Sequence, residues 1–252
     1  METVSIQGRK YKFFRPLRGG NGNKFNRALK LAIMFDELDD KLKGFYQNGN
    51  GLSLHAICSL AVRLLMHTGI RVGNEGSAEG YMTKPHPYSK AKPEFVKTYG
   101  LTTLKLEHVI SRKGKVYLNF VGKKQVENSY TLSGDLAGMV LNQVWVKKKS
   151  KDILGETIIN VTNHELNKFI RKYVGKQFSP KDFRTLRANM EAWHMLNVIS
   201  KRATPPTKSA FNEEVKEIAT HVSECLSNTP GVCKKSYIDD MLFDYHEELR
   251  KP

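Results

Sequence analysis

Two arginines, a lysine and a tyrosine break the pattern of an ordinary helical protein. Arg71 follows the predicted end of a helix in TGIRVGNE, and Lys123 falls at the turn after a predicted strand in FVGKKQ. Arg184, in SPKDFRTLRANMEAW, is predicted in the first turn of a helix, where a positive charge opposes the helix dipole. Tyr237 lies in the basic stretch CKKSY. A cation placed against a dipole and a tyrosine among cations both indicate an anionic ligand.

These four residue types together match the chemistry of a phosphodiester. Guanidinium groups pair with the non-bridging oxygens of a phosphate through parallel hydrogen bonds. A lysine can protonate a leaving alkoxide, and a deprotonated tyrosine is a competent nucleophile. Taken singly, Arg71 is explained by the dipole at a helix C-terminus, and Lys123 is an ordinary exposed lysine. The order Arg, Lys, Arg, Tyr is that of enzymes that transfer DNA strands through a tyrosine.

Several stretches in the right order make a family resemblance specific. They are GIRVGNE (69–75), YGLTTLKLEHV (99–109), NFVGK (119–123), SPKDFRTLRAN (179–189) and LSNTPGVCKKSYI (226–238). Through them the chain resembles the type IB DNA topoisomerases of the small poxvirus and bacterial kind, over roughly Leu52 to Ile238. The resemblance implies an α+β, mainly α-helical fold, the catalytic domain shared with tyrosine recombinases, with a small antiparallel three-stranded β-sheet.

The resemblance also implies a role for each matching residue. Arg71 and Arg184 would clamp the phosphate, Lys123 would be the general acid, and Tyr237 would be the nucleophile. Asn228 stands where many members have a histidine that donates to a non-bridging oxygen, and an amide can still donate that hydrogen bond. Contacts with the DNA backbone are expected from Tyr99, Lys124, Lys181, Lys234 and Lys235.

The implied reaction is a reversible transesterification that relaxes supercoiled DNA. The tyrosine would displace a 5′-hydroxyl and form a 3′-phosphotyrosyl bond, and the hydroxyl would later attack back. One phosphodiester replaces another of similar free energy, so no ATP is expected, and the glycines at 19, 20 and 22 lack the spacing of a nucleotide-binding loop. Arginines can supply the charge that a metal supplies elsewhere, so neither cofactor nor metal is expected. The expected partner is double-stranded DNA, clamped by a monomer.

The chain departs from the family pattern near its N-terminus and in one loop. The poxvirus-type enzymes carry a small β-rich N-terminal domain, whereas only residues 1–51 precede the matching region here. We therefore expect a reduced or missing clamp domain, with 1–23 as a short N-terminal extension and 24–252 as the catalytic domain. Residues 76–98 are an insertion. Three tyrosines are candidates for the one that contacts phosphate in this loop, namely Tyr81, Tyr88 and Tyr99.

Hydrophobic spacing predicts the elements of the first half. A strand is predicted within 4–14, followed by a basic, glycine-rich loop over 15–24. A helix ends at Gly44, a second helix runs over 53–69 with Ser53 as its N-cap, and 74–98 reads as a long loop. The buried face of the first helix should consist of Leu31, Phe35, Leu38 and Leu42.

A small sheet and then helices are predicted for the second half. The segments TTLKLEHVIS, KVYLNFVG and VENSYTLS alternate like strands, and the chain is helical from about residue 135 onward. Helix-start signatures occur at Thr162, Ser179 and Thr229. Tyr237 is therefore predicted about two turns inside the last of these helices.

Composition favours a polyanionic partner and a reducing compartment. Lys and Arg number 41 against 25 Asp and Glu, a net charge of +16, which fits nucleic acid but also a ribosome-associated or merely basic protein. The segments 10–24, 146–151 and 233–235 would track phosphates. The cysteines at 58, 225 and 233 show neither a zinc spacing nor a disulfide framework. With no apolar leader or span, we expect a soluble intracellular protein, in a bacterial cytoplasm or, if viral, in the host cell or virion.

Two alternatives remain open. A tyrosine recombinase or integrase shares the fold and the same residue logic, but it typically has a histidine three residues before the second arginine, where this chain has Lys181. The stretches GLTTL and KKSY also favour the topoisomerase. A DNA-binding relative that has lost catalysis is the other alternative, and the full set of candidate catalytic residues argues against it.

Overall fold

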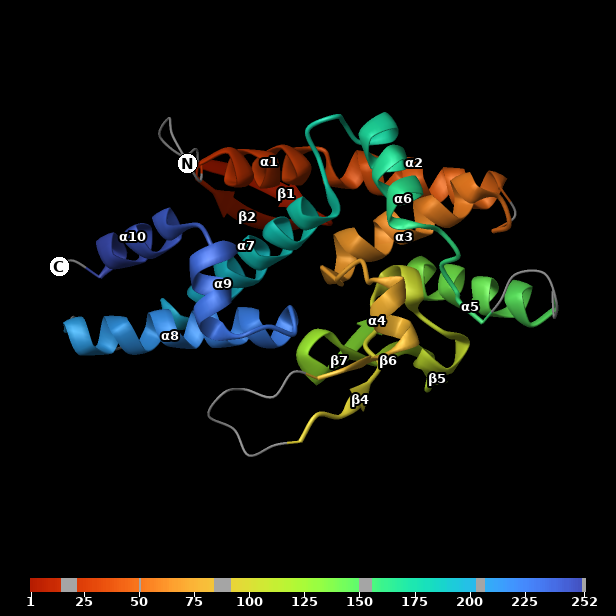
Figure 1. Cartoon of the computed structure of the whole chain (residues 1–252). Helices are drawn as coiled ribbons and strands as arrows, with labels where there is room; N and C mark the ends of the chain where they lie inside the picture. The colour runs from red at the N-terminus through yellow and green to blue at the C-terminus, as the bar shows by residue number, and fades with distance from the viewer. Residues whose placement is uncertain (15–21, 50, 84–91, 150–155, 203–206, 251–252) are drawn as a thin grey trace. The chain divides into compact units, whose positions relative to one another are not determined.

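The computed structural model describes residues 1–14, 22–49, 51–83, 92–149, 156–202 and 207–250 (Figure 1). The chain divides into two compact units. The first unit comprises 1–41, 65–69 and 173–252, and the second comprises 42–64 and 70–172. Both are described separately below. The fold is mainly helical with small antiparallel sheets, which confirms the predicted fold class. Among the described residues, no helix has the length and apolarity to cross a membrane.

The first unit begins with a hairpin where the sequence predicted one strand. Strands β1 (Glu2–Ile6) and β2 (Arg9–Phe13) pair antiparallel. They are joined by Gln7 and Gly8, both at positive φ, the conformation that a tight hairpin turn requires. The alternating pattern within 4–14 therefore continues across a turn that periodicity alone did not reveal.

The predicted helix ending at Gly44 is in fact two helices. α1 (Gly22–Ile33) and α2 (Phe35–Asn48) are separated at Met34, and α2 runs on past Gly44. Hydrogen bonds from Met34 N to the Lys30 carbonyl and from Leu38 N to the Met34 carbonyl persist, so the interruption is local. The predicted buried face is confirmed for Leu31, Phe35, Leu38 and Leu42.

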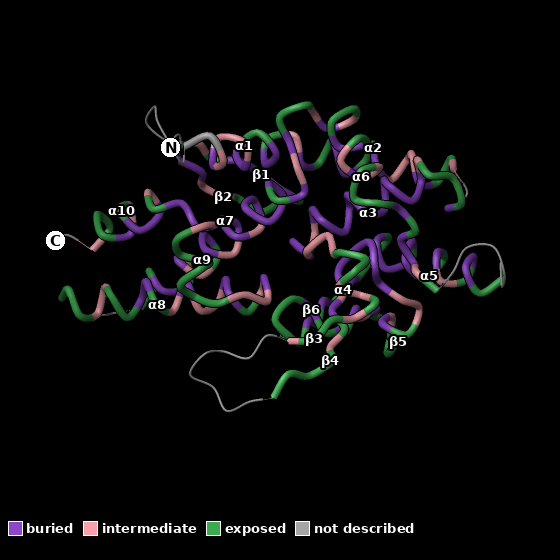
Figure 2. Tube along the Cα trace, viewed as in Figure 1, coloured by how far each residue is buried: buried purple, intermediate pink, exposed green. Residues whose placement is uncertain are grey.

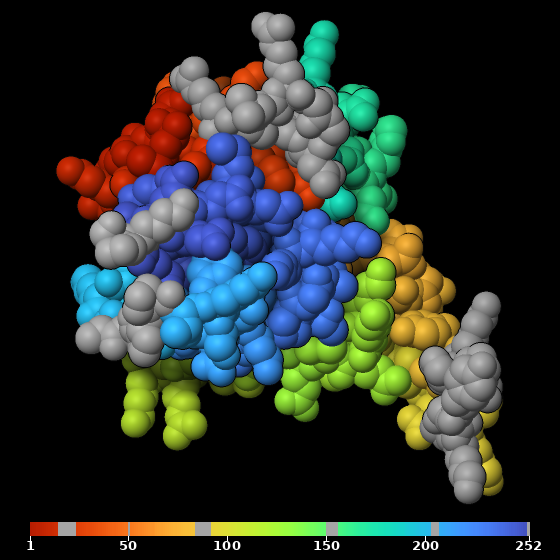
Figure 3. Space-filling view, turned by 90° about the vertical axis from the view of Figure 1, so that its left-hand side faces the viewer, coloured from red at the N-terminus to blue at the C-terminus, as the bar shows by residue number. Residues whose placement is uncertain are grey.

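Helix α7 (Pro180–Ile199) is the central element of the first unit. It packs with α1, β2 and α8 (Lys208–Cys225), and the short helix α9 (Pro230–Ser236) packs on α8. The helix α10 (Asp240–Leu249) completes a hydrophobic cluster that includes Phe14, Trp193, Ile218 and Tyr237. Figure 2 shows how much of α7 is buried, and Figure 3 shows a face on which the hairpin (red) adjoins the C-terminal helices (blue).

The predicted three-stranded sheet is confirmed in the second unit. β5 (Val109–Arg112), β6 (Lys115–Gly122) and β7 (Val126–Leu132) pair in that order, all antiparallel. Alternate residues of β6 are buried. The helices are most of α3 (Leu54–Thr68), α5 (Gly134–Lys149) and nearly all of α6 (Asn163–Tyr173). The predicted cap at Ser53 accepts from Ala56 N at 3.1 Å, and Thr162 Oγ1 accepts from Glu165 N at 3.2 Å.

The described part of the predicted loop 74–98 contains regular structure. Asn74 accepts a hydrogen bond from Ser77 N at 3.1 Å and caps the short helix α4 (Glu75–Glu79). The strands β3 (Tyr81–Met82) and β4 (Phe95–Val96) then pair antiparallel. The loop prediction was therefore wrong for these residues, because a local cap and two very short strands carry too little periodicity to be recognised.

Two glycines in the second unit lie backbone against backbone. A Cβ added to Gly100 would lie 2.6 Å from the Cα and N of Gly73 and 2.7 Å from the Arg71 carbonyl oxygen. Gly73 itself has φ of 103°, a region open mainly to glycine. The motifs around RVGN and YGLTT are thus held together at a distance that only glycine permits.

We predict that Gly100→Ala lowers the free energy of unfolding by about 1–3 kcal/mol, because the added methyl overlaps backbone that cannot move aside cheaply. Gly138→Ala is the control, since Gly138 lies in α5 with no atom within 4 Å of its added Cβ. That change should be neutral or stabilise by about 0.5–1 kcal/mol. Urea unfolding of both variants measures the difference, and equal stabilities would contradict the close-contact argument.

Candidate functional site

Arg71 is mounted in the second unit on an extended segment fixed by backbone hydrogen bonds. Leu101 N donates to the Arg71 carbonyl at 2.8 Å, and Thr102 N donates to the Val72 carbonyl at 2.7 Å. Asn163 Nδ2 reaches the Gly73 carbonyl at 3.1 Å. The residues after α3 therefore form a short ladder with 101–102 rather than a free loop, and Arg71, half-buried, projects from a fixed backbone.

Lys123 follows a strand that is hydrogen-bonded to the same segment. Tyr99 N donates to the Val121 carbonyl at 2.8 Å, two residues before Lys123. Lys123 is exposed and begins the turn η3 (Lys123–Gln125) between β6 and β7. Lys124 and Gln125 have φ of 63° and 59°, a left-handed conformation that is costly for such residues. The segment 99–102 is thus hydrogen-bonded both to the backbone of Arg71 and to the strand that precedes Lys123, within one unit.

The other DNA-contact candidates of the second unit differ in exposure. Lys124 is exposed. Tyr99 is half-buried, and its ring packs edge-on against His108 at 4.5 Å between centroids. Lys147, in the basic segment 146–151, is only 3% exposed, so the prediction that it tracks phosphates was wrong. Tyr88 lies outside the described residues, as do 15–21 and 150–151 of the predicted basic segments.

Arg184 is a buried cation held by the ends of two helices in the first unit. It is the fifth residue of α7, so it lies in the second turn and not in the first as predicted. Its Nη1 donates to the Gly69 carbonyl just past α3, and its Nη2 donates to the Leu226 carbonyl, the C-cap of α8, at 2.9 Å. Helix C-termini are electronegative, so these carbonyls offset the cost of burying the charge. The residue is 4% exposed.

The predicted N-cap of α7 sets the residue at which the helix that carries Arg184 begins. Ser179 Oγ donates to Asp182 Oδ2 at 2.7 Å, and Ser179 N donates to the same oxygen at 2.8 Å. Pro180 occupies the first helical position. Asp182 also pairs with Arg27 Nε at 2.7 Å. The start of α7 is therefore defined by local sequence and then tied to α1.

Tyr237 caps a helix instead of lying inside one. α9 ends at Ser236, and Tyr237 is its C-cap, with φ −125° and ψ −36°. The predicted position two turns inside the helix was therefore wrong, although the predicted N-cap Thr229 is confirmed by its hydrogen bond from Val232 N. The Tyr237 ring centroid lies 5.4 Å from the Arg184 guanidinium carbon and 6.0 Å from Lys181 Nζ.

Asn189 positions the Tyr237 backbone and was missed by the sequence analysis. Its Nδ2 donates to the Tyr237 carbonyl at 2.9 Å, and its Oδ1 accepts from Asp239 N at 2.9 Å. The amide therefore holds both sides of Ile238 in place. Asn189 closes the quoted stretch SPKDFRTLRAN and lies 5% exposed. An uncharged amide inside a predicted helix gives no signal of this role, because its partners lie 48 and 50 residues away.

Three buried side-chain nitrogens of the first unit have no partner among the described residues, and one of them, His246 Nδ1, belongs to α10. The other two belong to candidate site residues. They are Arg184 Nε and Asn228 Nδ2. The Asn228 side-chain oxygen accepts from Thr229 N at 3.1 Å, which orients the amide so that its NH₂ group is the free end. Arg184 donates to the Leu226 carbonyl, and Asn228 follows Leu226 by two positions. Buried donors in folded proteins are almost always paired, so these two unpaired donors call for an acceptor.

Surface cations gather on the same helices. Lys181, Lys234 and Lys235 are exposed, so they are free to meet a polyanion. Lys24, on α1, is the last residue of the predicted basic segment 10–24, and its Nζ donates to the Ser236 carbonyl at 3.1 Å, next to Tyr237. Burial, and then the charge of Lys181, lowers the pKa of Lys24 below its usual value.

The structure thus groups the predicted site residues within each unit. The first unit contains Arg184, Asn228 and Tyr237 with exposed lysines. The second contains Arg71 and Lys123, whose neighbouring backbone is hydrogen-bonded to 99–102. The catalytic and DNA-binding roles of all these residues stay predictions.

The family model and the relatives that match this chain all carry the name DNA topoisomerase. The family described as "Eukaryotic DNA topoisomerase I, catalytic core" matches residues 18–251. Over 241 residues the chain is 23% identical to DNA topoisomerase 1B of Acanthamoeba polyphaga mimivirus, which covers 92% of this chain and 66% of that protein. Over 155 residues it is 27% identical to DNA topoisomerase 1 of Rabbit fibroma virus (strain Kasza), covering 59% of this chain and 45% of that protein. The chain therefore spans less than two thirds of each relative.

We predict that Asn189→Ala lowers the free energy of unfolding by about 1–3 kcal/mol, since it leaves the buried Tyr237 carbonyl and Asp239 amide unpaired. Asn197→Ala is the matched control, because Asn197 is on the same helix and bonds only the Trp193 carbonyl one turn earlier. Thermal unfolding reports stability, and the backbone amide signals of 237–239 report the local change. A control variant that perturbs those signals as strongly would contradict the positioning role.

Proposed function

Since this chain belongs to the family of the eukaryotic DNA topoisomerase I catalytic core, we propose that it is a type IB enzyme that relaxes supercoiled duplex DNA. We further propose that it acts as a monomer clamped around the duplex, with 24–252 as the catalytic domain. Its bond making and breaking would need neither ATP nor a metal ion, and it would act in a bacterial cytoplasm or, if viral, in the host cell or virion.

The observation that carries the proposal is the pair of buried donors near Tyr237. Arg184 Nε and Asn228 Nδ2 have no partner among the described residues, and a phosphodiester has non-bridging oxygens to accept both. The Arg184 guanidinium also lies beside the Tyr237 ring. A phosphate that met these donors would be close to the candidate nucleophile, which the reaction requires.

In the proposed reaction, Tyr237 loses its phenolic proton and its oxygen attacks the phosphorus of one phosphodiester. The bond from phosphorus to the 5′-oxygen breaks, and the 3′-phosphate remains on the tyrosine. Arg71, Arg184 and Asn228 stabilise the negative charge that develops on the non-bridging oxygens. Lys123 gives a proton to the departing 5′-oxygen. The free 5′-hydroxyl end swivels and then attacks the phosphotyrosyl bond, which restores the strand and the tyrosine.

The proposed roles of Arg184 in the first unit and of Lys123 in the second are supported by different observations. Arg184 is held rigidly by two helix-end carbonyls, so it would be pre-oriented before DNA arrives. Lys123 is exposed on a constrained turn, which leaves its amine free to reach a leaving group. That Arg71 and Lys123 act on the same phosphodiester as Tyr237 rests on motif order and family membership.

We expect wild-type protein to relax supercoiled plasmid in EDTA without ATP and to form a covalent adduct with duplex DNA. Tyr237→Phe should abolish both, because it removes only the attacking oxygen. Tyr117→Phe on β6 is the control and should keep both. Agarose gels and denaturing adduct gels measure the outcomes. Strand exchange without relaxation would favour a recombinase, and DNA binding without any wild-type adduct would favour a non-catalytic relative.

We expect Lys123→Ala to slow strand cleavage by about 10²–10⁴-fold, the usual contribution of a general acid. A substrate with sulfur in place of the 5′-bridging oxygen should restore the rate, since a thiol has a pKa of about 8.5 and leaves without protonation. Lys124→Ala, the neighbouring exposed lysine, is the control and should show no such rescue. Single-turnover cleavage measures both substrates, and an equal defect on each would exclude Lys123 as the acid.

A further inference from the structure

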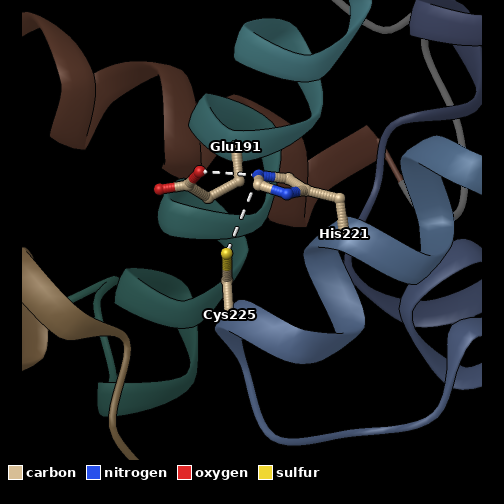
Figure 4. Close-up of side chains that lie close together, drawn as sticks. All are labelled: Glu191, His221 and Cys225. Atoms are coloured by element: carbon tan, nitrogen blue, oxygen red, sulfur yellow. Dashed lines mark hydrogen bonds and ion pairs between the residues drawn. The ribbon is translucent and has the colours of Figure 1, made fainter. Parts of the chain in front are cut away.

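A glutamate, a histidine and a cysteine of the first unit, none of them assigned to strand transfer, lie close together between α7 and α8. Glu191 lies on α7, and His221 and Cys225 lie one turn apart on α8, as Figure 4 shows. His221 Nε2 is 3.1 Å from Glu191 Oε2 and 3.8 Å from Cys225 Sγ. Within the described ranges, these three alone bring potential ligand atoms within 4.8 Å of one another.

The donor set and its spacing fit a tetrahedral metal ion. Zinc binds thiolate sulfur at about 2.3 Å and imidazole nitrogen or carboxylate oxygen at about 2.0–2.2 Å. Tetrahedral angles then separate a sulfur from a nitrogen by about 3.5 Å, close to the observed distance. Sulfur, imidazole and carboxylate together are the mixture that zinc prefers over magnesium or calcium. All three side chains are half-buried, so an ion could enter.

The surroundings of the cluster are charged. Arg187 Nη2 pairs with the other carboxylate oxygen of Glu191 at 2.5 Å, leaving Oε2 for the histidine. The exposed His194 lies on the same side, with its ring centroid 6.3 Å from that of His221. Hydrogen bonds with Cys225 and Glu191 raise the pKa of His221 to about 10. Metal ligation in general uses the thiolate and the neutral imidazole, so metal binding at such a donor set releases protons.

We propose that Glu191, His221 and Cys225 form a zinc-binding site that fastens the end of α8 to α7, with a water completing the coordination. Cys225 is the last residue of α8. The next residue, Leu226, gives its carbonyl to Arg184, and Asn228 follows two positions later. Zinc thus holds the turn that carries these groups, as a structural ion that takes no part in bond making or breaking.

Cobalt(II) titration of the full chain without DNA tests this site. We expect one ion per chain, d–d bands typical of tetrahedral cobalt, a thiolate-to-cobalt charge-transfer band, and loss of these signals when zinc is added. Cys225→Ser should abolish the charge-transfer band, and His221→Asn and Glu191→Gln should weaken binding by more than about tenfold. His164→Asn, an exposed histidine on α6, is the control and should bind as wild type.

Circular dichroism of each variant shows whether it is folded, and zinc should raise the melting temperature of wild type but not of Cys225→Ser. A charge-transfer band that survives Cys225→Ser, or no binding by folded wild type, would overturn the proposal. Because none of these measurements uses DNA, failure of the zinc site and failure of the strand-transfer proposal are distinguishable.

Discussion

The burial of one guanidinium group constrains most of the first unit. The guanidinium group of Arg184 is almost wholly inside the protein, so its hydrogen bonds must be made by other buried groups. The carbonyls that serve are those of Gly69 and Leu226, each at the end of a helix. Helix ends have unpaired carbonyls and negative potential, so the cation and the two ends satisfy one another. Moving either helix would leave a buried charge short of partners.

Gly69 is suited to this arrangement by its lack of a side chain. Its φ is 64°, which lets α3 end, and an added Cβ would lie 2.9 Å from Leu226 Cδ2 and 3.2 Å from Arg187 Cβ. The close approach brings the end of α3 within reach of Arg184 from α7. Two residues later the chain reaches Arg71. Gly69 therefore accepts a hydrogen bond from one candidate arginine, Arg184, and precedes the other, Arg71, by two residues in the sequence.

Caps and strands, which depend on residues close together in the sequence, could be predicted. Contacts between residues far apart in the sequence could not. The caps at Ser53, Ser179 and Thr229 each depend on a partner three positions further on, so they could be predicted from the local sequence. The three strands alternate within themselves and were also found. The roles of Asn189 and Glu191 depend on partners 30 to 50 residues away, which no local pattern encodes. Searching for paired cysteines likewise could not reveal a cluster that uses one cysteine.

The position of Tyr237 shows why this long-range information matters for chemistry. At a helix C-cap its N–H still bonds the Cys233 carbonyl, while its own carbonyl takes the Asn189 amide instead of continuing the helix. Both ends of the residue are thereby fixed although the helix has ended. The remaining freedom is that of the side-chain torsions, which the 7% exposure of the residue limits further. A nucleophile inside a regular helix would project along a direction set by the helix alone. At this cap, α7 sets the direction, and α7 also carries Arg184, so the candidate nucleophile and the candidate phosphate ligand share one rigid support.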